Sequence, residues 1–364
     1  MTTNMETFNS EVHSSTVLIR FGNSHSRSAL SRLPTETLCN IFVHCLPEDD
    51  SEYLSRASNV AMLTRVCRRW REVSVSMSNL WCRLSVGKDW QQTAFCYETW
   101  LRRSRGRPLS LALDCHTDHW TQLRSLLGPY INRVSALSLD FSSGANQPEV
   151  MIADFFALEK LTISTDGSDL MPAVAKSISQ LPLTLRSLKT TNLLPVFDLE
   201  YNPTWAHLTN IEINAHGLNT LPSLLNLCPH LSSLTIVAVI TEIEALEPST
   251  HTTLQSIRII SGDLFGDTVE DLGLFDALSL PNLRALEARY VQPWPHEEFK
   301  EFLTRSKCLL ESLTFGDGVV TTDEQRAEYV ALIPSLKIVV DPMRTEFTFK
   351  LYRRSLCTYF ADDI

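Results

Sequence analysis

The side chains in this 364-residue chain that are able to carry out chemistry are few and scattered. Only Cys115, His116 and His119 lie close enough in sequence to suggest a metal, and no fourth ligand is nearby. Asp317, which lies between two glycines, is typical of a turn after a strand. Motifs such as GxSxG, HExxH and the glycine-rich phosphate loop are absent. We therefore expect no enzyme activity, no cofactor and no bound metal.

The cysteines and the apolar segments indicate in which cellular compartment the protein is expected. There are nine cysteines, an odd number without a CxxC pair, and several fall in apolar helical patterns typical of reduced thiols. The sequence shows no signal peptide and no run of 18 apolar residues. The expectation is a cytoplasmic or nuclear protein that does not contact a membrane.

The charge of the chain is uneven. The net charge is −10, yet residues 65–107 hold ten basic and three acidic side chains, an excess of seven positive charges. This stretch fits either solvated helix faces or a docking surface for an acidic partner. It lacks the aromatic and glycine pattern of an RNA-binding sheet, so no nucleic acid is expected.

A repeated apolar motif occupies most of the chain. Its form is an apolar residue, two residues of any type, a second apolar residue, one residue of any type, and a third apolar residue. Successive copies follow one another at a short, fairly even interval that is typical of solenoid repeats. The copies are Val134/Leu137/Leu139, Leu158/Leu161/Ile163, Leu185/Leu188/Thr190, Leu208/Ile211/Ile213, Leu231/Leu234/Ile236, Leu254/Ile257/Ile259, Leu283/Leu286/Ala288, Leu310/Leu313/Phe315 and Ile333/Leu336/Ile338, with a weaker one at Pro108/Leu111/Leu113.

This period predicts an irregular leucine-rich repeat solenoid over residues 108–345, with a C-terminal cap over 346–364. Each copy would be a short strand whose alternate side chains face a core shared with its neighbours. The usual buried asparagine is missing, because its place is taken by Ser142, Asp166, His216 and Val239 in four copies. A sandwich of ordinary strands and helices is the alternative.

Residues 29–85 predict a separate helical module. In LPTETLCNIFVHCLP, which begins at Leu33, the residues Leu38, Ile41, Phe42 and Cys45 share one helix face. A second helix face comprises Leu63, Val66, Cys67 and Trp70, and Leu80-Trp81 follows. Residues 1–28 predict a disordered arm, and residues 86–107 a linking helix.

Five short segments follow one another in an order that resembles the F-box. They are Leu33-Pro34-Thr35-Glu36, Ile41-Phe42, Leu46-Pro47, Val66-Cys67-Arg68-Arg69-Trp70 and Leu80-Trp81. Together with the repeats, it resembles the large F-box-like family of mushroom-forming fungi. The resemblance implies binding to a Skp-type adaptor and through it to a cullin. It assigns adaptor contacts to Leu33, Pro34, Ile41, Phe42, Leu46, Val66, Cys67 and Trp70, although core packing stays an alternative for each. The acidic stretch Glu48–Asn59 is longer than an F-box needs and is interpreted as a loop insertion.

The expected fold class is therefore α/β, with a three-helix F-box-like module before an irregular leucine-rich repeat solenoid. The expected function is substrate recognition for a cullin-type ubiquitin ligase, and a protein-binding scaffold without a ligase link is the alternative. Side chains between the core residues of each strand point outward and are candidate contacts for an unknown target protein. These candidates are Lys160, Lys189, Glu212, Arg258, Glu287 and Arg289.

Overall fold

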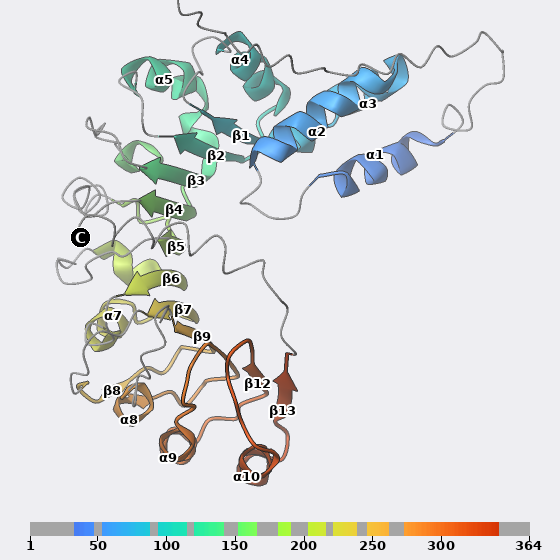
Figure 1. Cartoon of the computed structure of the whole chain (residues 1–364). Helices are drawn as coiled ribbons and strands as arrows, with labels where there is room; N and C mark the ends of the chain where they lie inside the picture. Colours follow the sequence, from blue (N-terminus) through green and yellow to red (C-terminus); the bar gives the residue numbers. More distant parts are fainter. Residues whose placement is uncertain are drawn as a thin grey trace, which may run out of the picture.

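The structure is a computed structural model, shown in Figure 1. It describes residues 33–46, 53–87, 94–114, 120–141, 152–165, 181–190, 203–215, 221–238, 246–261 and 273–341. The predicted disordered arm and C-terminal cap lie outside these residues. So do the four positions of the missing asparagine, and the Cys115, His116 and His119 group.

The first described residues form a small helical module. Its elements are α1 (Thr35–His44), α2 (Tyr53–Val66), α3 (Arg68–Ser76) and the 3-10 turn η3 (Ser78–Trp81). They enclose a core of their own, made of Leu38, Phe42, Leu46, Val60, Leu63, Val73, Leu80 and Trp81. Leu38 and Phe42 are one turn apart on α1 and are fully buried, as expected from the helical spacing.

Two expectations for this module need correction. The stretch Glu48–Asn59 is not wholly a loop, because α2 begins at Tyr53. The apolar face that includes Leu63 and Trp70 does not lie on one helix either. Cys67 has an extended backbone that ends α2, and its sulfur accepts the Trp70 backbone N–H at 3.5 Å to cap α3.

The rest of the described chain is built on one parallel sheet of eleven strands. The strands follow each other in space in the same order as in sequence. They are β1 (Arg83–Val86), β2 (Leu109–Asp114), β3 (Val134–Phe141), β4 (Lys160–Thr165), β5 (Ser187–Thr190), β6 (Asn210–Ala215), β7 (Ser233–Ala238), β9 (Ser256–Ser261), β11 (Ala285–Arg289), β12 (Ser312–Phe315) and β13 (Lys337–Val340). A second sheet pairs β8 (Ser249–Thr250) with β10 (Leu278–Ser279). Because eleven strands lie in one sheet and the second sheet has only two short strands, the described residues do not form the alternative of a sandwich.

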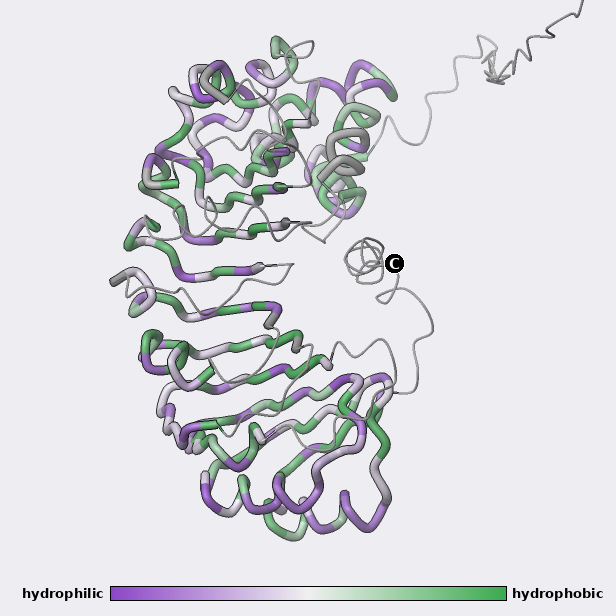
Figure 2. The backbone as a smooth tube through the Cα atoms, turned by 60° about the vertical axis from the view of Figure 1, so that its left-hand side comes forward, coloured by the Kyte–Doolittle hydropathy of each residue, from purple (hydrophilic) through white to green (hydrophobic). Residues whose placement is uncertain are grey.

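Each motif copy predicted from sequence coincides with one strand, from β2 to β13. From β2 to β12 the second and third motif positions are aligned across the sheet and buried, as in Leu161, Leu188 and Ile211 of β4, β5 and β6. Even Thr190, at a degenerate third position, is only 2% exposed. The last copy is shifted by two residues, because Leu336 precedes β13 and Ile338 pairs with Leu313, a second motif position. In Figure 2, hydrophobic and hydrophilic positions alternate along the stacked strands.

The strand β1 was not predicted. Trp81, Leu84 and Val86 nevertheless fit the same motif, one repeat length before the weak copy at Pro108. All three side chains are buried. The expected linking helix over 86–107 is replaced by this strand and by the shorter helix α4 (Ala94–Arg103). The repeat therefore begins inside the segment that also closes the helical module.

Helices lie on one side of the stacked strands (Figure 1). They are α4, α5 (Trp120–Leu127), α7 (Leu221–Leu227), α8 (Leu274–Ala277), α9 (His296–Ser306) and α10 (Asp323–Leu332). Their apolar faces and the inward residues of the strands share one continuous core. The helix α9 buries Phe299, Phe302 and Leu303, which lie on one face.

Hydroxyl groups tie several repeats together just before their strands. Thr184 donates to the carbonyl of Leu158 at 2.8 Å, and Ser232 donates to the carbonyl of Thr209 at 2.9 Å. Thr253 donates to the carbonyl of Pro229 at 2.7 Å. These side-chain bonds add to the backbone hydrogen bonds that link each repeat to the preceding one.

A buried polar cluster joins α9 to α10. The Tyr329 hydroxyl accepts the indole N–H of Trp294 at 2.8 Å and lies 2.6 Å from Nδ1 of His296. Tyr329 is fully buried, and burial raises the pKa of its hydroxyl, which therefore stays protonated. The hydroxyl can accept from Trp294 and donate to a neutral His296 at the same time.

We expect Tyr329→Phe to lower the free energy of unfolding by about 1–3 kcal/mol, because it leaves buried polar groups of Trp294 and His296 without a partner. Urea unfolding followed by circular dichroism measures the change. Tyr97→Phe is the control, since the half-buried Tyr97 makes no hydroxyl bond within the described residues. Equal stability of the two variants would contradict this role of the cluster.

Candidate functional site

The residues predicted to contact an adaptor do not share one environment. Phe42 and Leu46 are buried in the core of the helical module, while Leu33, Ile41 and Trp70 are half-buried against it. The Trp70 ring packs on Phe42 with the ring centroids 4.9 Å apart. The remaining three, Pro34, Val66 and Cys67, are exposed.

The structure adds two exposed apolar residues that the sequence prediction missed, Met62 and Val43. Met62 is 64% exposed and lies one turn from the predicted contact Val66, which is 56% exposed, whereas Leu63 between them is buried. Val43 on α1 is 45% exposed. The spacing of Met62 and Val66 is the signal that would have indicated a second, outward face of α2. Exposed apolar pairs of this kind are typical of contact surfaces.

Two arginines hold the helical module in shape. The Arg69 guanidinium donates to the carbonyl of Leu33, which ties the start of the module to α3. Arg71 donates from Nε to the carbonyl of Thr64 at 2.9 Å, across the break between α2 and α3. The Leu33-Pro34 segment and the exposed end of α2 are therefore both fixed relative to α3.

Trp81 joins the module to the sheet. Its ring is 3% exposed, lies in the module core, and packs edge-on against Trp100 of α4 with the ring centroids 4.7 Å apart. The Trp81 indole N–H donates to the carbonyl of Ser74 at 2.8 Å, and that of Trp100 donates to the carbonyl of Arg83 at 3.1 Å. One aromatic pair thus bonds to both α3 and β1.

The candidate target contacts on the outward sheet face mostly pair with one another. Lys189 on β5 and Glu212 on β6 form an ion pair at 2.8 Å. Glu287 on β11 binds Arg258 of β9 at 2.7 Å and Arg289 of its own strand at 2.6 Å. Lys160, at the start of β4, is exposed. The structure therefore brings these residues together in two separate groups on one face.

Arg289 extends the second group toward the ends of the last strands. Its guanidinium lies 3.7 Å from a carboxylate oxygen of Asp317 and 3.9 Å from one of Asp341. Although partial burial opposes it, hydrogen bonds from Arg289 and Arg258 hold the pKa of Glu287 below its ordinary value. The carboxylate thus stays ionised at neutral pH, and the group has fixed charges of both signs.

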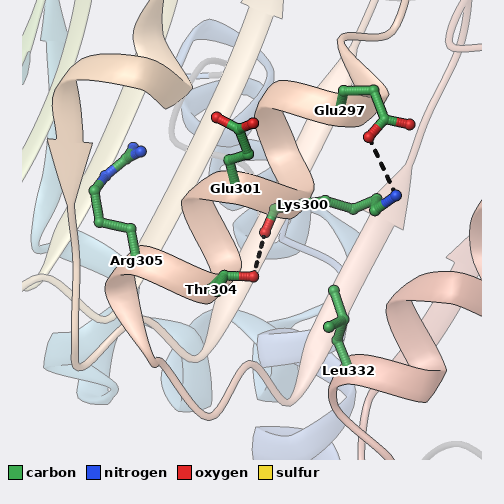
Figure 3. Close-up of a pocket in the computed structure, with 6 residues that line it drawn as sticks. All are labelled: Glu297, Lys300, Glu301, Thr304, Arg305 and Leu332. Carbon is green, nitrogen blue, oxygen red and sulfur yellow. Dashed lines mark hydrogen bonds and ion pairs between the residues drawn. The ribbon is translucent and has the colours of Figure 1, made fainter.

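A shallow groove of about 420 Å³ lies between α9 and α10 (Figure 3). Most of its charged side chains are already engaged, because Lys300 binds Glu328 at 2.6 Å and Glu297 at 3.2 Å, whereas Glu301 forms no ion pair within the described residues. Arg305 donates to the carbonyls of Phe275 and Leu278. The groove offers mixed charges that compensate each other, so it does not define a ligand class.

Two further kinds of site are absent from the described ranges. No three His, Cys, Asp or Glu side chains there are grouped so that they could hold a metal ion. No helix in that part of the chain is both long and apolar enough to cross a bilayer.

We expect Trp81→Ala to lower the free energy of unfolding by about 3–5 kcal/mol, because it opens a cavity where module and sheet meet. Thermal unfolding of the full chain measures this. Phe95→Ala is the control on α4, since Phe95 is 78% exposed and its loss should cost about 0.5 kcal/mol or less. A small effect of Trp81→Ala would contradict the shared core.

The Glu287 ion pairs should make the free energy of unfolding depend on pH in the acid range. Because the folded-state pKa lies below the ordinary value of 4.5, their contribution is present above that pH and is lost as the pH falls through the folded-state pKa. Glu287→Gln should cost up to about 1 kcal/mol at pH 7 and less at pH 3.5. Urea unfolding at both pH values, with the exposed Glu159→Gln as control, tests this. A cost that does not change with pH would contradict it.

Comparison with known proteins agrees with the geometry of the helical module. The family described as F-box-like matches residues 30–87, which run from the start of the module to the end of β1. No curated protein matches the chain. Residues 30–87 are therefore an F-box-like domain, and it is followed by a parallel sheet with helices on one side.

Proposed function

We propose that this chain is the substrate-recognition adaptor of a cullin-RING ubiquitin ligase. The F-box-like domain binds a Skp-type adaptor and through it the cullin, and the sheet binds a target protein. The observation that carries the proposal is the F-box-like domain itself, because F-box domains typically bind such adaptors. The chain catalyses no reaction; it raises the concentration of the target near the ubiquitin-charged enzyme. Such a role is carried out in the cytoplasm or nucleus.

We interpret the sheet as an irregular leucine-rich repeat solenoid. Ten sequence motifs at repeat-length intervals, each on a strand of one parallel sheet in chain order, support this interpretation. The fusion of such repeats to an F-box-like domain is also what supports the resemblance to the fungal family. A solenoid exposes the outward side chains of its strands along a broad surface, which suits protein binding.

Four exposed residues define the adaptor-facing surface we propose: Pro34, Met62, Val66 and Cys67. They provide apolar contact area on the helical module, outside its core. Phe42, Leu46 and Trp70 would act from beneath this surface by shaping α1 and α3. The two groups of paired charges, Lys189 with Glu212 and Glu287 with Arg258 and Arg289, lie on the strand face that would receive a target.

The double variant Met62→Asp with Val66→Asp should weaken binding to a Skp-type adaptor by at least about tenfold, because it places two charges in an apolar contact. Co-purification and isothermal titration with the full chain measure this. Val330→Asp is the control, since Val330 on α10 is 40% exposed and lies in the last helix of the sheet region. The control should bind the adaptor as the wild type does.

Two results would count against the ligase role. The first is a failure of the wild-type chain to bind the adaptor. The second is adaptor binding that leaves the exposed thiol of Cys67 open to alkylation. If a stable partner then binds the sheet, and deletion of residues 1–85 from this chain does not change that partner's half-life, the chain is a protein-binding scaffold instead.

A further inference from the structure

The described arginines differ in what their guanidinium groups contact. In the C-terminal half, Arg258, Arg284, Arg289 and Arg326 each pair with a carboxylate. Around the end of α4, Arg103, Arg105, Arg107 and Arg133 form no ion pair with any carboxylate of the described residues. Among the described residues, the positive excess of residues 65–107 is therefore not paired with carboxylates at this place.

Neutral groups hold three of these four arginines in position. The Arg103 guanidinium lies over the Trp81 ring, 4.5 Å from its centroid. Nε of Arg107 donates to the Ser78 hydroxyl at 2.8 Å. Arg133, from the turn before β3, donates to the Ser104 hydroxyl at 2.7 Å and to the carbonyl of Arg107.

These contacts gather the four side chains around one turn. Ser104–Arg107 connects α4 to β2, near the top of the stack in Figure 1, and it packs beside η3 through Ser78. Arg105 and Gly106 both have positive φ angles, 49° and 79°, so the chain reverses sharply here. Arg105 is exposed, and its guanidinium makes no polar contact in the described part of the chain.

We propose that Arg103, Arg105, Arg107 and Arg133, which we call the arginine turn, bind an acidic, carboxylate-rich peptide segment of a partner protein. Three of the guanidinium groups are already ordered by a ring, hydroxyls and a carbonyl, so binding costs little side-chain entropy. No carboxylate of the described residues pairs with them, which favours an anionic partner and speeds its association. Bidentate hydrogen bonds from guanidinium to carboxylate add geometric selectivity.

The proposal does not rest on the ligase role. The arginine turn lies where the F-box-like domain meets the sheet, away from Met62 and Val66 in sequence and from the ion pairs of the later strands. An adaptor on α2 and a target on the strand face would be separate events. An acidic segment held at the junction would add a second attachment point for the same or another partner.

The test uses the full chain and a fluorescein-labelled peptide of eight glutamates, with anisotropy as the readout. The double variant Arg105→Gln with Arg107→Gln should weaken binding about tenfold. The control Arg68→Gln with Arg284→Gln changes the net charge equally, but these arginines are exposed and paired with Glu72 and Glu311. The control should change binding less than about twofold. Raising NaCl should weaken binding to the wild type strongly.

The other outcomes overturn the proposal. Equal weakening by the two double variants would mean that only net charge matters. Absence of binding at low salt would mean that the turn has no affinity for carboxylates. Binding at least tenfold tighter to a phosphoserine peptide or an RNA octamer of equal charge would assign the turn to phosphate groups instead. Circular dichroism of each variant controls for folding.

Discussion

In a stack of parallel strands, the inward side chains of each strand are covered by the strands on either side. The strand at each end has a neighbour on one side only, so the core is exposed there unless another element covers it. At the start of this chain the F-box-like domain solves the problem. Trp81 is buried in the helical module and also occupies the first motif position of β1, while Leu84 and Val86 continue the sheet core. At the other end, Val339 and Val340 of β13 are about half exposed, 48% and 49%. The helical module therefore caps the N-terminal end of the sheet.

The closure of the sheet by the helical module limits how the two regions can move relative to each other. Trp81 and Trp100 bond to α3 and β1 through their indole N–H groups, and Arg107 and Arg133 tie η3, the end of α4 and the turn before β3 to one another. Two adjoining cores, both in contact with Trp100, and fixed hydrogen bonds leave little room for a hinge between the two regions. A protein bound on the strand face would then keep a set distance from one bound on α2. That property suits the proposed ligase role, and it also places the arginine turn at a fixed junction.

The sequence revealed the parts of the fold whose signal is periodic. The strands β2 to β13, the buried face of α1 and the helix α9 follow from the spacing of apolar residues. The strand β1 was missed because Leu80-Trp81 was assigned to the helical module alone, although Trp81 also occupies the first motif position before β1. The break at Cys67 depends on a sulfur cap that spacing does not show. The pairing of Arg258 with Glu287, which lie on different repeats, depends on strand register, which becomes known only when the strands are aligned.

From the contact between Trp81 and Trp100 we infer that the F-box-like domain and the sheet unfold as one cooperative body. Native-state hydrogen exchange of the full chain at increasing low concentrations of denaturant is the decisive measurement. The most protected amides of α3 and those of β2 and β3 should converge on one free energy of opening with one dependence on denaturant. Exchange of the α3 amides through a separate opening of clearly lower free energy, while β2 and β3 stay protected, would rule out a single cooperative body.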